Sequence, residues 1–199
     1  MSGRQSKLFS DTSKTSDTLP VLQGLSRDEV LPLAGEIRQF LVPFSWKVEI
    51  AGSFRRLRPT VNDLDFVVQP VRFEPAESDD NWLKILKTLR MELDVVTVKQ
   101  GPKLAVLNVP FVGKAGPGYV QVDLYRAKSS TWGILLLVRT GSKEHNVKLC
   151  NLAISKDLRL QYSVGLTDKG GRVVAGRSEE EVFAALGLPF IPPQERESP

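Results

Sequence analysis

The chain has 199 residues, 41% of them hydrophobic and 25% charged; this is an ordinary composition for a globular protein and excludes collagen-like and wholly disordered classes. Lys and Arg exceed Asp and Glu by 27 to 23, for a formal net charge of +4, a mild basic balance that suits a polyanionic partner. The single cysteine, Cys150, excludes an internal disulfide and a cysteine-based zinc site. The longest apolar run, residues 132–138, is too short to span a membrane. We expect a cytoplasmic, monomeric protein without a membrane segment.

The first part of the chain combines a polar segment with a capped helix. Residues 1–20 are mostly Ser, Thr, Lys and Asp and bury too little to offset the entropy cost of ordering, so we expect a flexible tail over residues 1–24. Ser26 is followed three residues later by Glu29, the pattern of a capping box. A helix that begins after Ser26 and is uneven near Pro32 is predicted from apolar residues at helical spacing, namely Val30, Leu33, Ile37 and Leu41.

Residues 25–128 predict a mixed β-sheet with covering helices. A helical pattern covers residues 79–92, and strand patterns cover residues 46–51, 63–70, 94–100, 103–112 and 119–127. A Gly-Ser turn separates the first two strands, and the glycines and proline of residues 113–118 suit a hairpin between the last two. The predicted fold class is therefore α+β.

The periodicity changes near residue 129 and predicts a second, smaller and mainly helical lobe over residues 129–199. Two helical segments, residues 130–141 and 142–157, are separated at Gly141, and Ser142 is placed to cap the second. The remaining segments are short strands within 158–176, a capped helix at 178–187 and an extended ending.

Three aspartates are candidates for binding divalent cations. Asp63 and Asp65 occupy positions i and i+2 of one strand, so their carboxylates share a face, opposite Leu64 and Phe66. If the strand that carries Asp123 pairs beside this strand, a third carboxylate joins them. At about 4 Å and an effective dielectric near 20, each like-charged pair costs roughly 4 kcal/mol. Such a cluster needs cations or protons, and its oxygen-only ligands suit Mg²⁺.

The stretch GSFRR, residues 52–56, is a candidate anion site. Gly52 allows backbone amides to approach a phosphate, and Ser53 adds a hydroxyl and an amide donor. Arg56 is the best candidate for a direct phosphate contact, beside Arg55 and Arg58, because a guanidinium fork matches phosphate oxygens. Taken singly, each feature has an ordinary explanation. An Asp-x-Asp strand is most often a solvated strand face, a Gly-Ser step is an ordinary turn, and the three arginines are ordinary surface residues.

The order strand, Gly-Ser, Asp-x-Asp and a later strand aspartate resembles the nucleotidyltransferase superfamily, and GSFRR with NDLDFVV resembles the family X DNA polymerases. Residues 139–149 resemble the Thr-Gly-Ser segment of the bacterial members, and EEEVFAALGLPFIPPQERE resembles their C-terminal ending. The resemblance covers residues 25–197. It implies a nucleotidyltransferase palm at 25–128 and a C-terminal nucleotide-binding lobe at 129–199.

The resemblance also implies roles for individual residues. Two Mg²⁺ ions, or Mn²⁺, would be bound by Asp63, Asp65 and Asp123, with Asp123 nearest the primer 3′ hydroxyl. The triphosphate would be contacted by Gly52, Ser53 and Arg56. The nucleotide sugar would lie against the turn formed by Thr140, Gly141 and Ser142, and the minor-groove edge of the base would be reached by Asn146. His145, beside it, is interpreted as an ordinary helix histidine.

The implied activity is addition of dNTPs to a primer 3′ hydroxyl, on gapped or primer-template DNA, and short-gap filling in DNA repair. Val138 and Arg139 replace the aromatic pair of most relatives, so we also expect ribonucleotide use. Cys150 replaces a template-contacting arginine, and neither lyase nor exonuclease activity is expected. The alternatives are a template-independent terminal transferase, another nucleotidyltransferase or a catalytically silent nucleic-acid-binding module.

Overall fold

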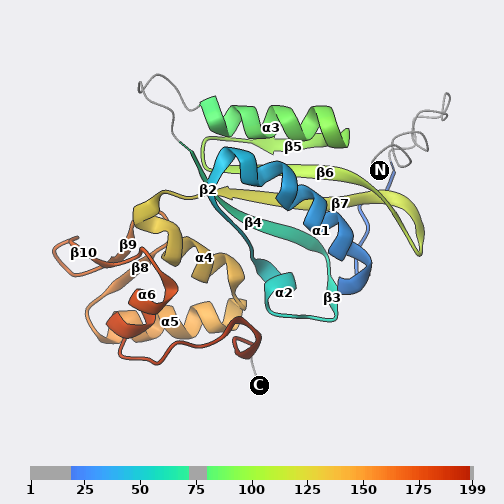
Figure 1. The fold of residues 1–199 in the computed structure, drawn as a ribbon. Coiled ribbons are helices and arrows are strands. Elements are labelled where there is room, and N and C mark those ends of the chain that lie inside the picture. The colour runs from blue at the N-terminus through green and yellow to red at the C-terminus, as the bar shows by residue number, and fades with distance from the viewer. Residues whose placement is uncertain (1–18, 72–79, 198–199) are drawn as a thin grey trace.

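The computed structural model describes residues 19–71 and 80–197 and has the expected α+β class (Figure 1). Its N-terminal part consists of β1 (Leu25–Ser26), α1 (Arg27–Leu41), η1 (Val42–Phe44), β2 (Ser45–Ile50), α2 (Gly52–Arg55), β3 (Thr60–Val61), β4 (Asp63–Pro70), α3 (Asp80–Leu93), β5 (Val96–Gln100), β6 (Leu104–Gly113) and β7 (Gly116–Arg126). Its C-terminal part consists of η2 (Ser129–Thr131), α4 (Trp132–Thr140), α5 (Lys143–Ser155), β8 (Arg159–Gln161), β9 (Gly165–Thr167), β10 (Val173–Ala175), α6 (Glu179–Ala185) and η3 (Pro193–Glu195).

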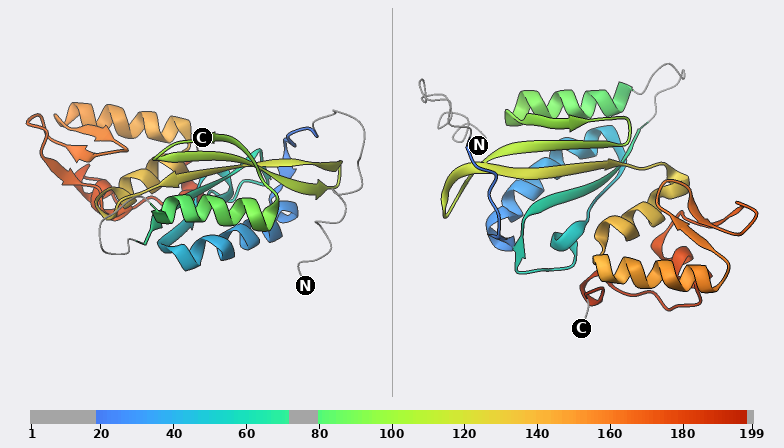
Figure 2. Two further views of the ribbon diagram at one scale, coloured as in Figure 1. Left: turned by 90° about the horizontal axis from the view of Figure 1, so that it is seen from above. Right: turned by 180° about the vertical axis from the view of Figure 1, so that it is seen from behind.

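A five-stranded sheet forms the N-terminal lobe, with the strand order β2-β4-β7-β6-β5. β4 and β7 are parallel, whereas the other neighbouring pairs in this sheet are antiparallel. Helices α1 and α3 lie on the same face of the sheet, as the view from above shows (Figure 2). Leu64 and Phe66 of β4 are fully buried in the core beneath these helices. Because side chains alternate along a strand, Asp63 and Asp65 lie on the opposite face.

Local sequence accounts for the first helix. The Ser26 hydroxyl accepts a hydrogen bond from the Glu29 N–H at 3.2 Å, so the predicted cap is confirmed. The apolar stripe predicted at helical spacing is buried, and Pro32 lies inside the helix. Before it, Leu22 N–H donates to Tyr119 O at 2.8 Å, and Tyr119 N–H donates to Pro20 O at 2.9 Å. The segment just before β1 therefore lies along β7, while residues 1–18 of the expected tail lie outside the described residues.

The C-terminal lobe packs α4, α5 and α6 with a three-stranded sheet of order β10-β9-β8. Gly141, with a φ of 71°, ends α4 in the left-handed region that favours glycine. Ser142 then caps α5 by accepting a hydrogen bond from the His145 N–H at 3.2 Å. The predicted break and cap are thus confirmed. Among the described helices, none is long and apolar enough to cross a bilayer.

Candidate active site

The pairing of β4 with β7 brings the three predicted metal-binding aspartates together. In the parallel register, Asp65 is the partner of Asp123, and Asp63 is the partner of Gln121. Neighbouring strands lie about 4.8 Å apart and side chains at i and i+2 share a face, so the carboxylates form one cluster on the face away from α1 and α3. The strand adjacency that the sequence could only suggest is confirmed.

Burial and mutual repulsion raise the pKa values of Asp63 and Asp65. Burial, with the negative charge of Asp123, raises the pKa of Asp63, although the Arg56 guanidinium acts in the opposite direction. Burial, with the charges of Asp63 and Asp123, raises the pKa of Asp65 to about 7. The cluster therefore holds part of a proton near neutral pH, which indicates that the surrounding protein does not supply enough positive charge.

Asp123 is held by its own neighbours along β7. Gln121 Nε2 donates to Asp123 Oδ1 at 3.0 Å, and the Tyr125 hydroxyl donates to Asp123 Oδ2 at 2.9 Å. The Arg139 guanidinium, from α4, lies 4.0 Å from the centre of the Tyr125 ring. Sequence reasoning missed Gln121 and Tyr125, although the spacing of two residues on either side of Asp123 was a usable signal.

The donor chemistry of the cluster suits a hard divalent cation such as Mg²⁺ or Mn²⁺, because carboxylate oxygens are the ligands these ions prefer. The pKa of about 7 at Asp65 follows from its burial and from the neighbouring charges of Asp63 and Asp123. As the side chains lie, no group of three or more His, Cys, Asp or Glu residues within 19–71 and 80–197 is arranged to hold a metal ion. Both oxygens of Asp123 are instead engaged by Gln121 and Tyr125.

The predicted anion site directly adjoins these carboxylates. Gly52 begins α2 rather than forming a simple turn, and its φ of 60° favours glycine. A Cβ atom at Gly52 would lie only 2.1 Å from Asp65 Oδ2. A side chain is therefore excluded at this position, and the backbone that leads into Ser53 lies against the carboxylate cluster.

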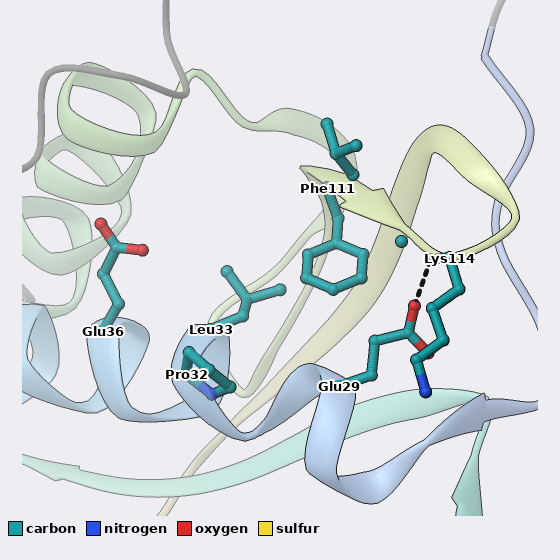
Figure 3. A pocket seen from close by; sticks show the side chains of 8 residues that line it. Glu29, Pro32, Leu33, Glu36, Phe111 and Lys114 are labelled. Carbon is teal, nitrogen blue, oxygen red and sulfur yellow. Dashed lines mark hydrogen bonds between the residues drawn. The ribbon is translucent and has the colours of Figure 1, made fainter.

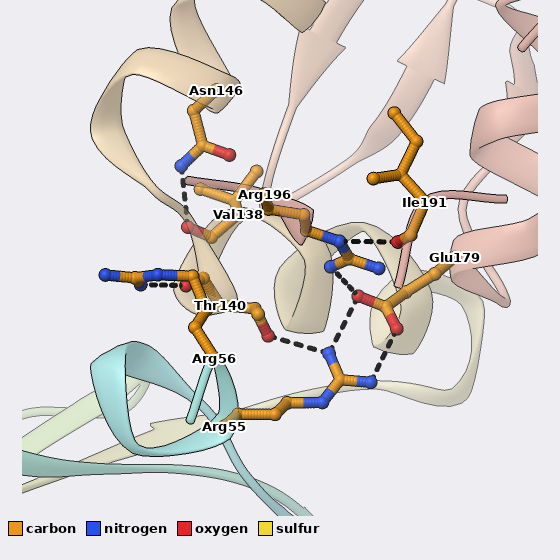
Figure 4. Close-up of polar contacts among 8 residues, drawn as sticks. All are labelled: Arg55, Arg56, Val138, Thr140, Asn146, Glu179, Ile191 and Arg196. Carbon is orange, nitrogen blue, oxygen red and sulfur yellow. Dashed lines mark hydrogen bonds and ion pairs between the residues drawn. The ribbon is translucent and has the colours of Figure 1, made fainter. Parts of the chain in front are cut away.

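Arg56 joins the anion site to the predicted sugar-binding turn. Its Nη1 donates to the carbonyl oxygen of Thr140, 84 residues away in the sequence, and lies 3.1 Å from a Cβ placed on Gly141 (Figure 4). Arg56 Nε donates to Glu197 Oε1 at 2.6 Å. Three segments that are distant in the sequence thus meet at one guanidinium.

The remaining predicted nucleotide contacts lie on α5 and its cap. Asn146 Nδ2 donates to Val138 O at 2.8 Å, while its Oδ1 is buried without a partner in the described structure. The Asn146 side chain is thus turned toward α4 (Figure 4). His145 is buried, and this burial, with the charge of Arg196, lowers its pKa to about 4. The interpretation of His145 as a structural residue agrees with this environment.

A buried ion network that the sequence did not reveal joins the two lobes. Glu179 accepts two hydrogen bonds from Arg55, at 2.9 and 2.7 Å, and a third from Arg196 at 2.6 Å (Figure 4). Arg196 is fully buried. Burial alone would raise the pKa of Glu179, but the hydrogen bonds and charges of the two arginines outweigh it, and the pKa is lowered. Arg55 also donates to the Thr140 hydroxyl at 2.7 Å.

Two hollows of the described surface lie outside this cluster. A pocket of about 440 Å³ lies between α1 and the β6–β7 hairpin and is lined by Glu29, Pro32, Leu33, Glu36, Phe111 and Lys114, among others (Figure 3). A larger groove of about 650 Å³ lies where the lobes meet and includes Trp46, Lys47, Trp132 and Arg177. Neither contains the three aspartates, so the site is defined by its chemistry rather than by a deep cavity.

The site combines a mixed sheet with carboxylates on two adjacent strands, a turn that glycine opens, and a helical lobe that contacts that turn. The model of the DNA polymerase beta thumb family matches residues 135–197. The chain is 32% identical over 171 residues to DNA polymerase/3'-5' exonuclease PolX of Bacillus subtilis (strain 168), covering 84% of this chain and 28% of the relative. It is 27% identical over 161 residues to DNA polymerase lambda of Rattus norvegicus, covering 73% of this chain and 28% of that relative.

Solved structures of Leishmania infantum polymerase beta share the fold. The ternary P/T complex has a TM-score of 0.72 at 23% identity and covers 89% of this chain and 78% of that chain. The ternary gap complex has a TM-score of 0.73 at 22% identity and covers 89% of this chain and 72% of that chain. The thumb-family match, the two relatives and the shared fold together support a family X DNA polymerase, and the chain spans 28% of the length of each of the two curated relatives described above.

Proposed function

We propose that this protein is a DNA-directed DNA polymerase that adds nucleotides to a primer 3′ hydroxyl. The observation that carries the proposal is the contact between the two halves of the site, where Gly52 leaves no room for a side chain beside Asp65 Oδ2. Because of this contact, a triphosphate on the anion turn would have its charge next to the carboxylate cluster. Asp63, Asp65 and Asp123 would hold two divalent cations, whose chemistry when bound is to stabilise the attacking and leaving oxygens of phosphoryl transfer.

The protein's own groups bind and orient the nucleotide in this proposal. Backbone amides at Gly52 and Ser53 and the guanidinium of Arg56 bind the triphosphate. The Thr140–Gly141 backbone is already in contact with Arg56, so the sugar would lie against it. Asn146 would reach the base by leaving the Val138 carbonyl. Asp123 would lie nearest the primer oxygen and would help to accept its proton.

The proposed substrate is gapped or primer-template DNA with a dNTP, and the proposed role is short-gap filling in repair. The basic balance of the chain, 27 Lys and Arg against 23 Asp and Glu, supports binding through the phosphate backbone. Binding of that kind weakens steeply with salt because counterions are released. An affinity for gapped DNA that stays constant between low and moderate salt would count against this part of the proposal.

The testing experiment offers a one-nucleotide gapped duplex, a recessed primer and a single strand, each with one dNTP or all four and Mg²⁺. Wild-type protein is compared with Asp123→Ala and with Glu49→Gln, which removes an exposed carboxylate from β2 of the same sheet. Templated addition by the wild type and by Glu49→Gln, but not by Asp123→Ala, is expected. Untemplated tails would instead identify a terminal transferase, and binding without extension a silent nucleic-acid-binding module.

A further inference from the structure

A carboxylate of the chain itself lies on the arginine that the proposed function assigns to the triphosphate. Glu197 Oε1 accepts a hydrogen bond from Arg56 Nε at 2.6 Å, and Glu197 Oε2 lies 3.9 Å from Arg58 Nη1. The side chains of Arg56 and Glu197 are 14% and 30% exposed, so water only partly screens the pair. One carboxylate therefore contacts two of the three arginines that follow Ser53.

The contact with Glu197 occupies an N–H donor of Arg56 that a phosphate would use. A guanidinium binds phosphate most strongly through two parallel N–H donors. In the structure Nε donates to Glu197, and Nη1 donates to the Thr140 carbonyl. A phosphate that uses Nε of Arg56 must take the place of the Glu197 carboxylate, because two anions cannot share one donor without strong repulsion.

Glu197 differs from the other acidic residue at the lobe boundary. Glu179 is 5% exposed as a side chain and is held by three hydrogen bonds from Arg55 and Arg196, so it cannot be exchanged without leaving buried charges unpaired. Glu197 has one close ion pair and one long one. The Glu197 carboxylate is thus held by far fewer contacts than Glu179, and a polyphosphate with several charges can displace it.

We propose that Glu197 is an intramolecular competitor for the triphosphate site, which occupies Arg56 and Arg58 until a polyphosphate displaces it. The proposal rests on the proposed function, since that function makes Arg56 a phosphate ligand. When a site is free for only a fraction of the time, the apparent affinity of its ligand falls by that fraction. Glu197 thus sets how tightly the protein binds a nucleotide, and nucleotide binding releases the Glu197 side chain.

The test measures binding of inorganic tripolyphosphate by calorimetry, without DNA and with a chelator in place of divalent cations. Wild-type protein is compared with Glu197→Gln and with Glu195→Gln, a matched change at an exposed glutamate two residues earlier. Glu197→Gln is expected to bind about three- to tenfold more tightly, in proportion to the occupancy of the internal carboxylate. Glu195→Gln is expected to match the wild type, and the gain is expected to shrink as salt screens the Glu197 pair.

A second measurement follows Glu197 itself. Tripolyphosphate added to the wild type is expected to increase amide hydrogen exchange at Glu197. Equal or weaker binding by Glu197→Gln, or unchanged exchange, would overturn the proposal while leaving the polymerase function standing. No tripolyphosphate binding by any of the three proteins would remove the phosphate site itself, and with it this proposal. A gain at Glu197→Gln in a protein that extends no primer would support the competitor role and count against the polymerase function alone.

Discussion

The two lobes each bury acidic side chains, but the pKa of the buried acid is lowered in one lobe and raised in the other. Glu179 of the C-terminal lobe is paired with Arg55 and Arg196, and its pKa is lowered. In the sheet lobe, Asp65 lies beside Asp63 and Asp123, and burial and these charges raise its pKa to about 7. Arginines are available nearby, since Arg55 and Arg56 follow Gly52 closely in the sequence, but their close partners are Glu179 and Glu197.

Under the proposed function, the difference separates a charge that holds the structure together from a charge that binds a ligand. The buried Glu179 carboxylate accepts three arginine hydrogen bonds, which hold the lobes together. A cluster of carboxylates that repel one another lowers the stability of the protein by itself, and the divalent cations of the proposed function would neutralise it.

The largest effect is expected for Asp65→Asn on nucleotidyl transfer. Loss of a cation ligand removes several kcal/mol of transition-state stabilisation, which corresponds to a rate lower by about a thousandfold or more. Single-turnover extension of a one-nucleotide gap measures it, with Glu49→Gln as the control. Retention of more than about a tenth of the wild-type rate would show that Asp65 is not a cation ligand.

Glu179→Gln is expected to destabilise the protein by about 3–5 kcal/mol, because it leaves the buried Arg196 without its charge partner. Urea unfolding gives the free energy, and Glu180→Gln, which removes the exposed neighbouring carboxylate, is the control. If both variants unfold at the same urea concentration as the wild type, the ion network does not fix the lobes.

Asp65 is expected to make a contribution to the stability of the metal-free protein that is lost as pH rises from about 4 to about 7. The folded protein keeps a proton on Asp65 up to a pKa of about 7, whereas the unfolded chain releases it near the ordinary pKa of 3.8. The folded state therefore binds more protons in this window, and the loss is on the order of 3 kcal/mol. Asp65→Asn should flatten this slope in urea titrations, and an equal slope in both proteins would refute the assignment.

His145 of the C-terminal lobe is expected to contribute the opposite slope. Its folded pKa of about 4 lies below the unfolded value of 6.5, so the unfolded state takes up the proton first. Stability is lost as pH falls from about 6.5 to about 4, by roughly 1–3 kcal/mol. Replacement by Gln should remove this part of the acid sensitivity, as measured by urea unfolding at a series of pH values. The prediction is wrong if NMR titration of the His145 ring in the folded protein gives a pKa near 6.5.

The smallest effect concerns sugar selection. Arg139 lies on the Tyr125 ring at a position where the resemblance leads one to expect an aromatic residue. Wild-type protein is expected to use ribonucleotides appreciably, and Arg139→Phe is expected to raise dNTP preference by about tenfold, or 1.4 kcal/mol. Single-turnover rates with matched dNTP and rNTP measure it, with Tyr162→Phe as a control that alters the more exposed ring near Arg139. Strong dNTP preference in the wild type would contradict the prediction.

The sequence was sufficient for those parts of the site that depend on local periodicity. Strand alternation placed Asp63 and Asp65 opposite Leu64 and Phe66, and the caps at Ser26 and Ser142 lie where the pattern indicated. The assignment of the Gly-Ser step to an anion site stays a prediction. The short helix that begins at Gly52 could not be predicted, since four residues carry little periodicity.

Contacts between distant segments account for most of what the sequence could not predict. Arg55 and Glu179 are 124 residues apart, and Arg56 and Glu197 are 141 apart. No local pattern marks such pairs, because any of the surface arginines and glutamates could have been partners. The parallel pairing of β4 with β7 was likewise only one of several possible strand orders. The hydrogen bond from the Tyr125 hydroxyl to Asp123 could be recognised only in the folded structure.

Calorimetric titration of Mn²⁺ into metal-free protein at about pH 7.5 tests whether the carboxylate cluster of the sheet lobe binds divalent cations. We expect saturable binding by the wild type, accompanied by proton release that shows as a dependence on buffer ionisation enthalpy, and binding weaker by at least about tenfold in Asp65→Asn. Equally tight binding by both proteins, or none by the wild type at millimolar Mn²⁺, would contradict this expectation.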